Sequence, residues 1–246
     1  MQTEIAITDL TRMKDGRVCI AGYTAERRCL RPVFRVGGLA ESWLYCVRGV
    51  AIRPFAVVAF DVLAPAHQPP PHTEDAYIDP TYRVVQQMAM VERHKLLMSI
   101  TEPSVEAIFG APIICEEGCF VRAGEGTRSL GTVCADIEQV IYAPHPDRWE
   151  YTLIFTDAAG ERWRMGIVDL ALRNAFDYLR IRHEVAPGVV AERFMAAISE
   201  AEVYVRLGLS RGWAKHPDRC YLQITGIHTF PDYLKGKCFA DFSLTG

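Results

Sequence analysis

Residues 203–233 read V-Y-V-R-L-G-L-S-R-G-W-A-K-H-P-D-R-C-Y-L-Q-I-T-G-I-H-T-F-P-D-Y and predict two strands joined by a short loop. Apolar residues alternate through 202–210 and again through 219–228, as they do in a half-buried β-hairpin. A plain hairpin does not need the arginines, the indole and the amide that interrupt this alternation. We interpret these polar side chains as a binding surface, made of Arg206, Ser210, Arg211, Trp213 and Gln223.

Short strands of the same kind are expected along much of the chain. The pattern predicts strands at 3–8, 17–23, 29–33, 55–63, 112–122, 132–142, 151–156 and 162–168. Helical spacing of apolar residues predicts helices at 80–99, 103–109, 168–180 and 189–201. The first of these has Asp79 as a candidate N-cap and Pro80 at the first helical position, which is a strong start signal.

The order of these elements indicates a mainly β (α+β) protein with interspersed short helices. Strands and helices do not alternate regularly, which excludes a parallel Rossmann-like sheet. Many short strands with Gly and Pro turns favour small barrels or a sandwich. The chain has 246 residues, of which 50% are hydrophobic, so it can form one large domain or two small ones.

The sequence predicts a cytoplasmic protein without a membrane segment. Its apolar stretches, such as 55–60, are too short to span a bilayer. The first residues, M-Q-T-E-I-A-I, lack the charged and then apolar plan of a signal peptide.

Eight cysteines are present, and most of them sit among apolar neighbours, where we expect buried free thiols. Cys115 and Cys119 flank E-E-G in C-E-E-G-C, and Cys134 follows. These three are weak candidates for zinc, because the second pair of a complete zinc motif is missing. The sequence therefore predicts neither a metal site nor another cofactor.

The charge of the chain is distributed unevenly. The net charge is −3, yet residues 1–53 hold nine Lys/Arg against five Asp/Glu, and residues 203–246 hold six against three. If these two segments meet, they form a basic face on an acidic protein. The alternative is that the arginines are scattered over the surface.

Several motifs together resemble a known group of bacterial proteins. They are R-V-C-I-A-G-Y (17–23), R-C-L-R-P-V (28–33), the F-D strand (60–61), H-T-E-D (72–75), S-L-G-T-V (129–133), Y-T-L-I-F-T-D (151–157), R-L-G-L-S-R (206–211) and Q-I-T-G-I-H-T-F-P-D-Y (223–233). This set, spread over nearly the whole chain, resembles the dual OB-containing domain proteins. The chain departs from that pattern at T-A-E-R-R-C (24–29), where the family has a more glycine-rich turn.

The resemblance implies two OB-like barrels, which we place at 1–122 and 123–246, and no assigned activity. OB barrels commonly bind single strands with a basic groove and stacking aromatic side chains. We therefore predict binding of single-stranded DNA or RNA. The contacts would come from Arg17 and Arg31 in the first barrel, and from Arg206, Arg211 and Trp213 in the second.

Three alternatives remain open at this stage. The chain could sense a nucleotide or another small ligand, or it could be an adaptor that meets protein partners in a defence or repair assembly. Catalysis is the third, because H-T-E-D places an imidazole and two carboxylates on one loop. The sequence has no G-x-S-x-G, Walker, H-E-x-x-H or G-x-G-x-x-G motif, so we expect no catalytic residues.

Overall fold

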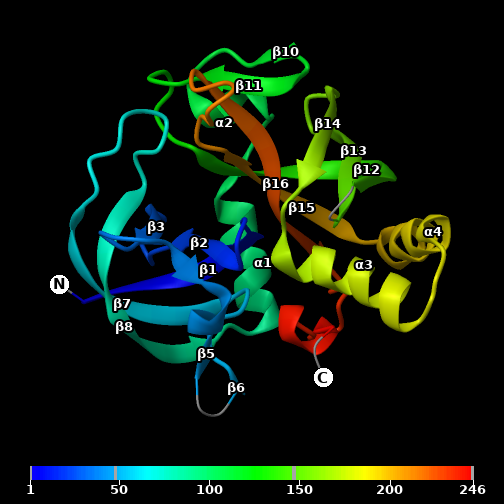
Figure 1. The fold of residues 1–246 in the computed structure, drawn as a ribbon, viewed down its shortest axis with the longest axis horizontal. Helices are drawn as coiled ribbons and strands as arrows, with labels where there is room; N and C mark the ends of the chain where they lie inside the picture. Colours follow the sequence, from blue (N-terminus) through cyan, green and yellow to red (C-terminus); the bar gives the residue numbers. More distant parts are fainter. Residues whose placement is uncertain (1, 47–48, 146–147, 245–246) are drawn as a thin grey trace.

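The computed structural model describes residues 2–46, 49–145 and 148–244. The protein is mostly β, with two closed five-stranded barrels and a few short helices, which confirms the expected fold class. The barrels lie side by side, the first in blue to cyan and the second in green to orange (Figure 1).

The first barrel closes in the order β1-β2-β3-β8-β7 and back to β1. All its neighbouring pairs are antiparallel except β3 and β8, which are parallel. Its strands are β1 (Gln2–Arg12), β2 (Arg17–Tyr23), β3 (Cys29–Val33), β7 (Ala56–Pro65) and β8 (Asp75–Gln87). Between β3 and β7 lie β4 (Leu39–Ala40), η1 (Glu41–Leu44), β5 (Tyr45–Cys46) and β6 (Gly49–Val50).

The second barrel repeats this strand order as β12-β13-β14-β16-β15, and its third and fifth strands are again the parallel pair. Its strands are β12 (Leu130–His145), β13 (Arg148–Asp157), β14 (Arg162–Ile167), β15 (Glu202–Leu209) and β16 (Arg219–Phe230). Helices α3 (Leu170–Arg182) and α4 (Pro187–Ile198) connect its third and fourth strands. The repeated order is consistent with a dual OB-like arrangement.

Smaller elements link the two barrels. They are α1 (Met90–Ser99), β9 (Thr101–Glu102), α2 (Glu106–Phe109), β10 (Ile114–Glu116) and β11 (Gly118–Arg122), and η2 (Phe239–Phe242) follows the last strand. Strand β11 pairs with β16, so residues 118–122 extend the sheet of the second barrel. Conversely, Leu170, Ala171 and Phe239 pack into the core of the first barrel, so the two halves of the chain share a core.

The predicted helix at 80–99 is wrong over its first ten residues, because residues 75–87 form β8 and the helix begins only at Met90. The predicted N-cap, Asp79, does accept a hydrogen bond from a backbone amide two residues later, that of Thr81, at 2.9 Å, but no helix follows it directly. The register between β7 and β8 shifts between Phe60 and Val62, opposite Pro80. A bulge tolerates proline within a strand, and pairing with two neighbouring strands outweighs the local helical spacing.

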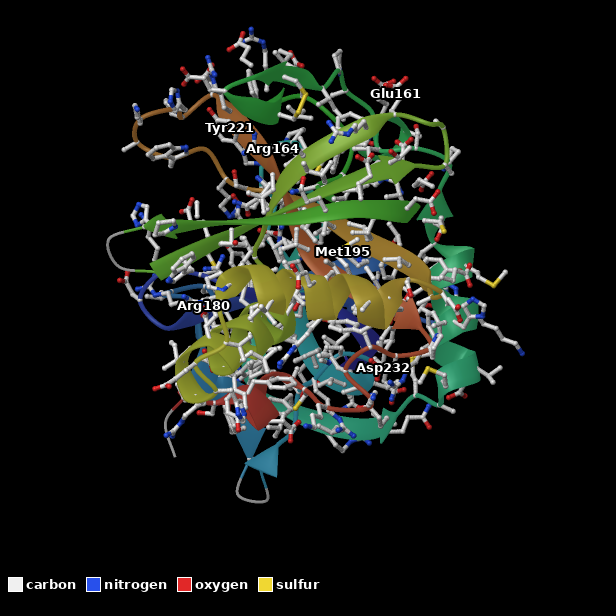
Figure 2. The ribbon with its side chains drawn as sticks, turned by 90° about the vertical axis from the view of Figure 1, so that its right-hand side faces the viewer. Glu161, Arg164, Arg180, Met195, Tyr221 and Asp232 are labelled. Carbon is white, nitrogen blue, oxygen red and sulfur yellow. A yellow bond between two sulfur atoms is a disulfide. The ribbon has the colours of Figure 1, made fainter. Side chains whose placement is uncertain are left out.

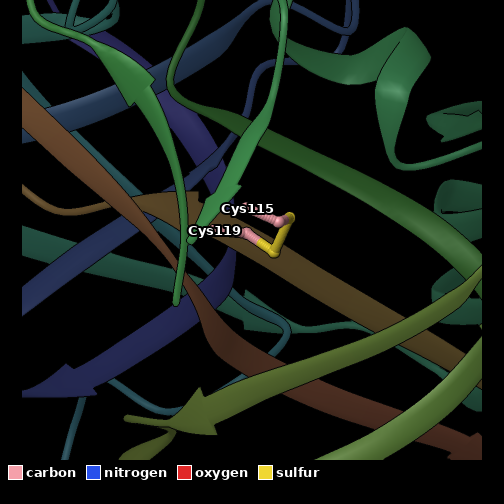
Figure 3. The surroundings of a disulfide bond; sticks show 2 residues. All are labelled: Cys115 and Cys119. Atoms are coloured by element: carbon pink, nitrogen blue, oxygen red, sulfur yellow. A yellow bond between two sulfur atoms is a disulfide. The ribbon is translucent and has the colours of Figure 1, made fainter. Parts of the chain in front are cut away.

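The expectation of free thiols is wrong for two of the eight cysteines. Cys115 and Cys119 face each other across the β10–β11 hairpin and form a disulfide with an S–S distance of 2.00 Å (Figure 3). The other six cysteines are free. The spacing that suggested a weak zinc motif is therefore that of two directly paired residues on adjacent strands.

A buried ion pair joins the two barrels. Arg206 on β15 is fully buried, and its Nη2 lies 2.8 Å from Oδ2 of Asp9 on β1. The Arg206 Nη1 donates to the Tyr23 hydroxyl at 3.0 Å and to Thr132 Oγ1 at 2.7 Å. Asp9 also accepts from Thr225 Oγ1 at 2.5 Å. Both charges thus have a nearly complete set of partners, drawn from both barrels.

Removing one charge of this pair should destabilise the fold strongly. In Asp9→Asn the Arg206 charge remains buried without a counter-ion, and we expect a loss of about 3–5 kcal/mol in the free energy of unfolding. Chemical denaturation followed by circular dichroism measures this loss. The apolar double variant Asp9→Leu/Arg206→Met should recover most of the stability, because it buries no charge.

The matched control is Glu4→Gln, which removes an exposed carboxylate that lies 3.7 Å from Arg83. We expect a change of no more than about 1 kcal/mol, as is usual for exposed pairs. Equal losses in Asp9→Asn and Glu4→Gln would show that the buried pair does not hold the barrels together.

Candidate nucleic-acid interface

The structure separates the predicted binding residues into buried and exposed groups. Arg206 and Arg31 are buried, whereas Arg211 and Trp213 are exposed on the loop between β15 and β16. Ser210 and Gln223 are half-buried near this loop, and the Ser210 Oγ accepts a hydrogen bond from the Tyr221 amide at 2.9 Å. Arg17 lies apart at the exposed start of β2, where its side chain packs beside Gly38.

The two basic terminal segments do meet in space, as the contact between Asp9 and Arg206 shows. This meeting buries the arginine inside the protein. Arg206 therefore serves the junction between the barrels in this conformation, and a ligand on the surface does not reach it.

A second polar joint connects the loops that precede the fifth strand of each barrel. Asp75, whose side chain is 1% exposed, accepts from Arg31 Nε at 2.6 Å and pairs through its other oxygen with Arg211. Asp75 follows loop 66–74 of the first barrel, and Arg211 lies on loop 210–218 of the second. One end of the Arg211 guanidinium is thereby fixed, while 49% of its side chain stays exposed.

The H-T-E-D motif belongs to this joint. Glu74 accepts hydrogen bonds from the Ser129 hydroxyl at 2.9 Å and from the amides of Ser129 and Leu130 at 2.5 and 3.1 Å. Arg31 Nη2 donates a hydrogen bond to His72 Nδ1 at 3.0 Å. The two carboxylates of the motif thus connect the barrels, and the imidazole orients Arg31 within the first barrel.

A histidine–cysteine pair lies at the edge of the same cluster. His72 Nε2 is 3.9 Å from the Cys220 sulfur. Burial raises the pKa of the Cys220 thiol, while burial and the charges of Arg31 and Arg211 lower the pKa of His72 to about 4. The two side chains are therefore neutral near pH 7, which is the opposite of an activated thiolate–imidazolium pair.

The exposed part of loop 210–218 carries an aromatic side chain in an unusual place. The Trp213 indole is 52% exposed and makes an edge contact with the His216 ring at 5.5 Å. His216 in turn contacts Tyr221 on β16, with 6.2 Å between the ring centroids. Large aromatic side chains are normally buried, so an exposed one is informative when it lies beside other rings.

Arg164 on β14, the third strand of the same barrel, is an exposed cation that sequence reasoning missed. In R-W-R-M-G-I the buried Trp163, Met165 and Ile167 alternate with exposed residues, so Arg164 points outward. β14 lies beside β16 at Gly166 and Ile167, which pair with Gln223 and Ile224, whereas Tyr221 pairs with Phe120 of β11. We call Trp213, His216 and Tyr221, whose rings contact one another in this order, the aromatic strip.

Some of the cations around the strip form ion pairs with carboxylates, and others do not. Arg162 pairs with Glu138 at 2.7 Å, and Arg219 pairs with Glu116 at 3.2 Å. Within the described part of the chain, no carboxylate lies within ion-pair distance of Arg164 or Lys215. These two remain available to phosphate groups.

The first barrel carries a pocket at its second and third strands, β2 and β3. A cavity of about 530 Å³ is lined by Tyr23, Arg27, Arg28 and Cys29 of β2, β3 and their connecting turn, and by Arg128 next to β12. Arg128 is tied to Glu102 at 2.6 Å. Sequence reasoning missed Arg27 and Arg128, because the pocket forms only where the second barrel covers the first.

The three cysteine candidates for a metal do not come together. Cys115 and Cys119 are joined to each other in the disulfide, so their thiolates cannot ligate zinc. Cys134 lies on β12 as a free thiol. Over residues 2–46, 49–145 and 148–244, no three His, Cys, Asp or Glu side chains lie close enough together to hold a metal ion.

Comparison with known proteins adds no identification. No protein-family model matches the sequence, and no curated protein matches it. In the described ranges, no helix combines the length and the apolar character needed to cross a membrane.

The buried histidines should make stability depend on pH. Burial lowers the pKa of both His72 and His228 to about 4, below the ordinary value of 6.5. The contribution of each histidine to the free energy of unfolding is therefore complete above pH 6.5. It is lost as the pH falls toward 4, and the loss is on the order of 2–3 kcal/mol for each. Burial raises the pKa of Asp169 to about 6. This carboxyl group therefore increases the free energy of unfolding as the pH falls from 6 to 4, which is opposite to the effect of the histidines.

Variants of the histidines separate their effect on pH-dependent stability from that of Asp169. His72→Asn keeps an acceptor for Arg31, and His228→Gln keeps a donor for the Thr8 carbonyl, which His228 contacts at 2.8 Å. We expect both variants to lose less stability than the wild type between pH 7 and pH 4 in denaturant titrations. His67→Asn, at an exposed position, should follow the wild-type curve. Identical curves for all four proteins would contradict the assignment.

Proposed function

We propose that this chain binds single-stranded nucleic acid along the aromatic strip, with phosphate contacts from Arg164, Lys215 and the exposed face of Arg211. The observation that carries the proposal is the half-exposed Trp213 indole on the loop between the fourth and fifth strands of a five-stranded barrel. In OB barrels this loop and the second and third strands form the ligand-binding face.

The chemistry of the strip suits a polymer with stacked bases and a charged backbone. The rings of Trp213 and Tyr221 offer flat surfaces, and every base can stack on such a ring without sequence preference. Its rings follow one another, Trp213 to His216 at 5.5 Å and His216 to Tyr221 at 6.2 Å, so we expect successive nucleotides to bind along it. The dual OB-like arrangement supports our proposal that the chain belongs to the dual OB-containing family of bacterial proteins.

The test is fluorescence anisotropy with labelled single-stranded DNA, single-stranded RNA and duplex DNA at two salt concentrations. We expect tighter binding of single strands, weakened by salt as phosphate contacts release counter-ions. Trp213→Ala should weaken binding by about 1–3 kcal/mol, which is roughly 5- to 150-fold. Arg164→Gln should weaken binding and make it less sensitive to salt.

Two exposed positions away from the strip serve as matched controls. Arg83→Gln removes a cation on β8, and Met98→Ala shortens an exposed apolar side chain on α1. Both should bind as the wild type does. Full affinity in Trp213→Ala and Arg164→Gln, or no binding by the wild type at either salt concentration, would refute the strip as the nucleic-acid site.

A second candidate function is recognition of a nucleotide or another small ligand, and the first-barrel pocket favours it. Its volume of about 530 Å³ lies in the range of small-molecule sites. Arg27 and Arg28 line it, and neither forms an ion pair with another described residue. Tight binding of a mononucleotide with little dependence on strand length would favour this function, and Arg28→Gln would then reduce it.

A further inference from the structure

A second cavity lies between the two barrels, away from the aromatic strip. It measures about 220 Å³ and is lined by the segment before β7, the first turn of α1, and the end of β16 with the loop that follows. Asp232 marks this loop in Figure 2, well away from Arg164 and Tyr221. The volume corresponds to about seven water molecules and is below the usual range for drug-sized ligands. Only a small ligand group fits inside.

Two arginines line this inter-barrel cavity with free donors. Arg53 Nε donates to the Gln87 side chain at 3.0 Å, and Arg93 Nε donates to the Met88 carbonyl at 2.9 Å. Among the residues with described positions, none accepts from the terminal Nη groups of either arginine. Burial lowers the pKa of Arg93; the charge of Asp232 raises it, and that of Arg53 lowers it. The two arginines are therefore close enough to repel each other, and Asp232 is the acidic group that acts on Arg93.

The acidic groups around the cavity form no direct ion pair with Arg53 or Arg93 among the described residues, although the Asp232 charge acts on Arg93. Asp232 accepts from the amides of Leu234 and Gly236 at 2.9 and 2.8 Å. Both Asp169 oxygens are used by backbone amides, those of Ala171 and Leu172 on one side and that of Ile227 on the other. Neither carboxylate forms an ion pair with a described residue. Lys237 also lines the cavity, so cations outnumber acids there by three to two.

Two further residues that carry polar groups line the same cavity. The Tyr233 hydroxyl is fully buried, without a hydrogen-bond partner among the described residues, so a ligand in the cavity does not reach it. His228 donates from Nε2 to the Thr8 carbonyl, which leaves Nδ1 as an acceptor. The Phe55 ring, with the Arg93 guanidinium 5.3 Å above it, supplies an apolar wall.

We propose that the inter-barrel cavity binds a small organic oxyanion, carrying a phosphate or a carboxylate, between the guanidinium groups of Arg53 and Arg93. Planar guanidinium forks match both of these anions by paired hydrogen bonds. Arg53 comes from the first barrel, whereas His228 and Tyr233 come from the second barrel and the loop that follows it. An occupant therefore contacts both barrels and stabilises the folded protein by mass action.

The test measures thermal unfolding and calorimetric binding of the full chain with three probes at equal ionic strength. The probes are inorganic phosphate, adenosine monophosphate and succinate, with sodium chloride as the reference. We expect at least one oxyanion to raise the unfolding temperature of the wild type above the chloride reference. Phosphate against succinate distinguishes the two anion chemistries, and adenosine monophosphate shows whether a larger group is tolerated.

Variants separate a specific site from general anion effects. Arg53→Gln and Arg93→Gln should each weaken binding at least about 10-fold, the value of one charged hydrogen bond. Arg93→Lys keeps the charge without the fork and should also bind more weakly, which covers the case that the glutamine variant does not fold. Arg83→Gln, an exposed arginine on β8, should bind as the wild type does.

Two outcomes overturn the proposal: no oxyanion stabilises the wild type beyond chloride, or Arg53→Gln and Arg93→Gln respond as the wild type does. The nucleic-acid assay is independent of this one. Both variants should bind single strands with wild-type affinity, because neither residue belongs to the aromatic strip. Loss of nucleic-acid binding together with oxyanion binding would assign Arg53 and Arg93 to the nucleic-acid site, and would refute a separate cavity ligand.

Discussion

The arrangement of the molecule depends on one buried ion pair, between Asp9 of the first barrel and Arg206 of the second. A charge pair without water is stable only when almost every donor and acceptor is satisfied. Tyr23, Thr132 and Thr225 supply the remaining hydrogen bonds, and they come from both barrels. The two barrels therefore cannot shift relative to each other without leaving charged groups unpaired.

The backbone around the pair is shaped for close approach. A Cβ at Gly226 would lie 3.1 Å from the Thr8 carbonyl oxygen and 3.4 Å from the Arg206 Cβ. A side chain there would push β16 away from β1. The hydrogen bond from His228 to the Thr8 carbonyl would then lengthen. Glycine at this position is explained by contact between strands, since its backbone angles are not of the left-handed kind.

The sequence predicted the strands of both barrels well, because alternation and turn residues are local signals. Strands β2 and β3 begin and end where the pattern placed them. The helix at 80–99 failed because β8 is held by pairing with β7 and β3, and no local pattern records that pairing. Polar residues within apolar strands were recognised as unusual, but Asp9 lies 197 positions before Arg206, so the sequence could not show that this arginine is paired.

The two joints leave corresponding faces of the barrels differently covered. In the first barrel, Glu74 accepts hydrogen bonds from the amides of Ser129 and Leu130, and Arg128 and Leu130 line the pocket beside β2 and β3. In the second barrel, Asp75 holds only one edge of loop 210–218, through Arg211, and Trp213 stays open to solvent. The proposed small-ligand site and the proposed nucleic-acid site differ in this respect: a pocket suits a small group, whereas exposed rings suit a chain that continues past both ends of the site. The two barrels share one strand order, and the difference between these faces arises from the contacts between the barrels, which cover part of one face and leave the other exposed.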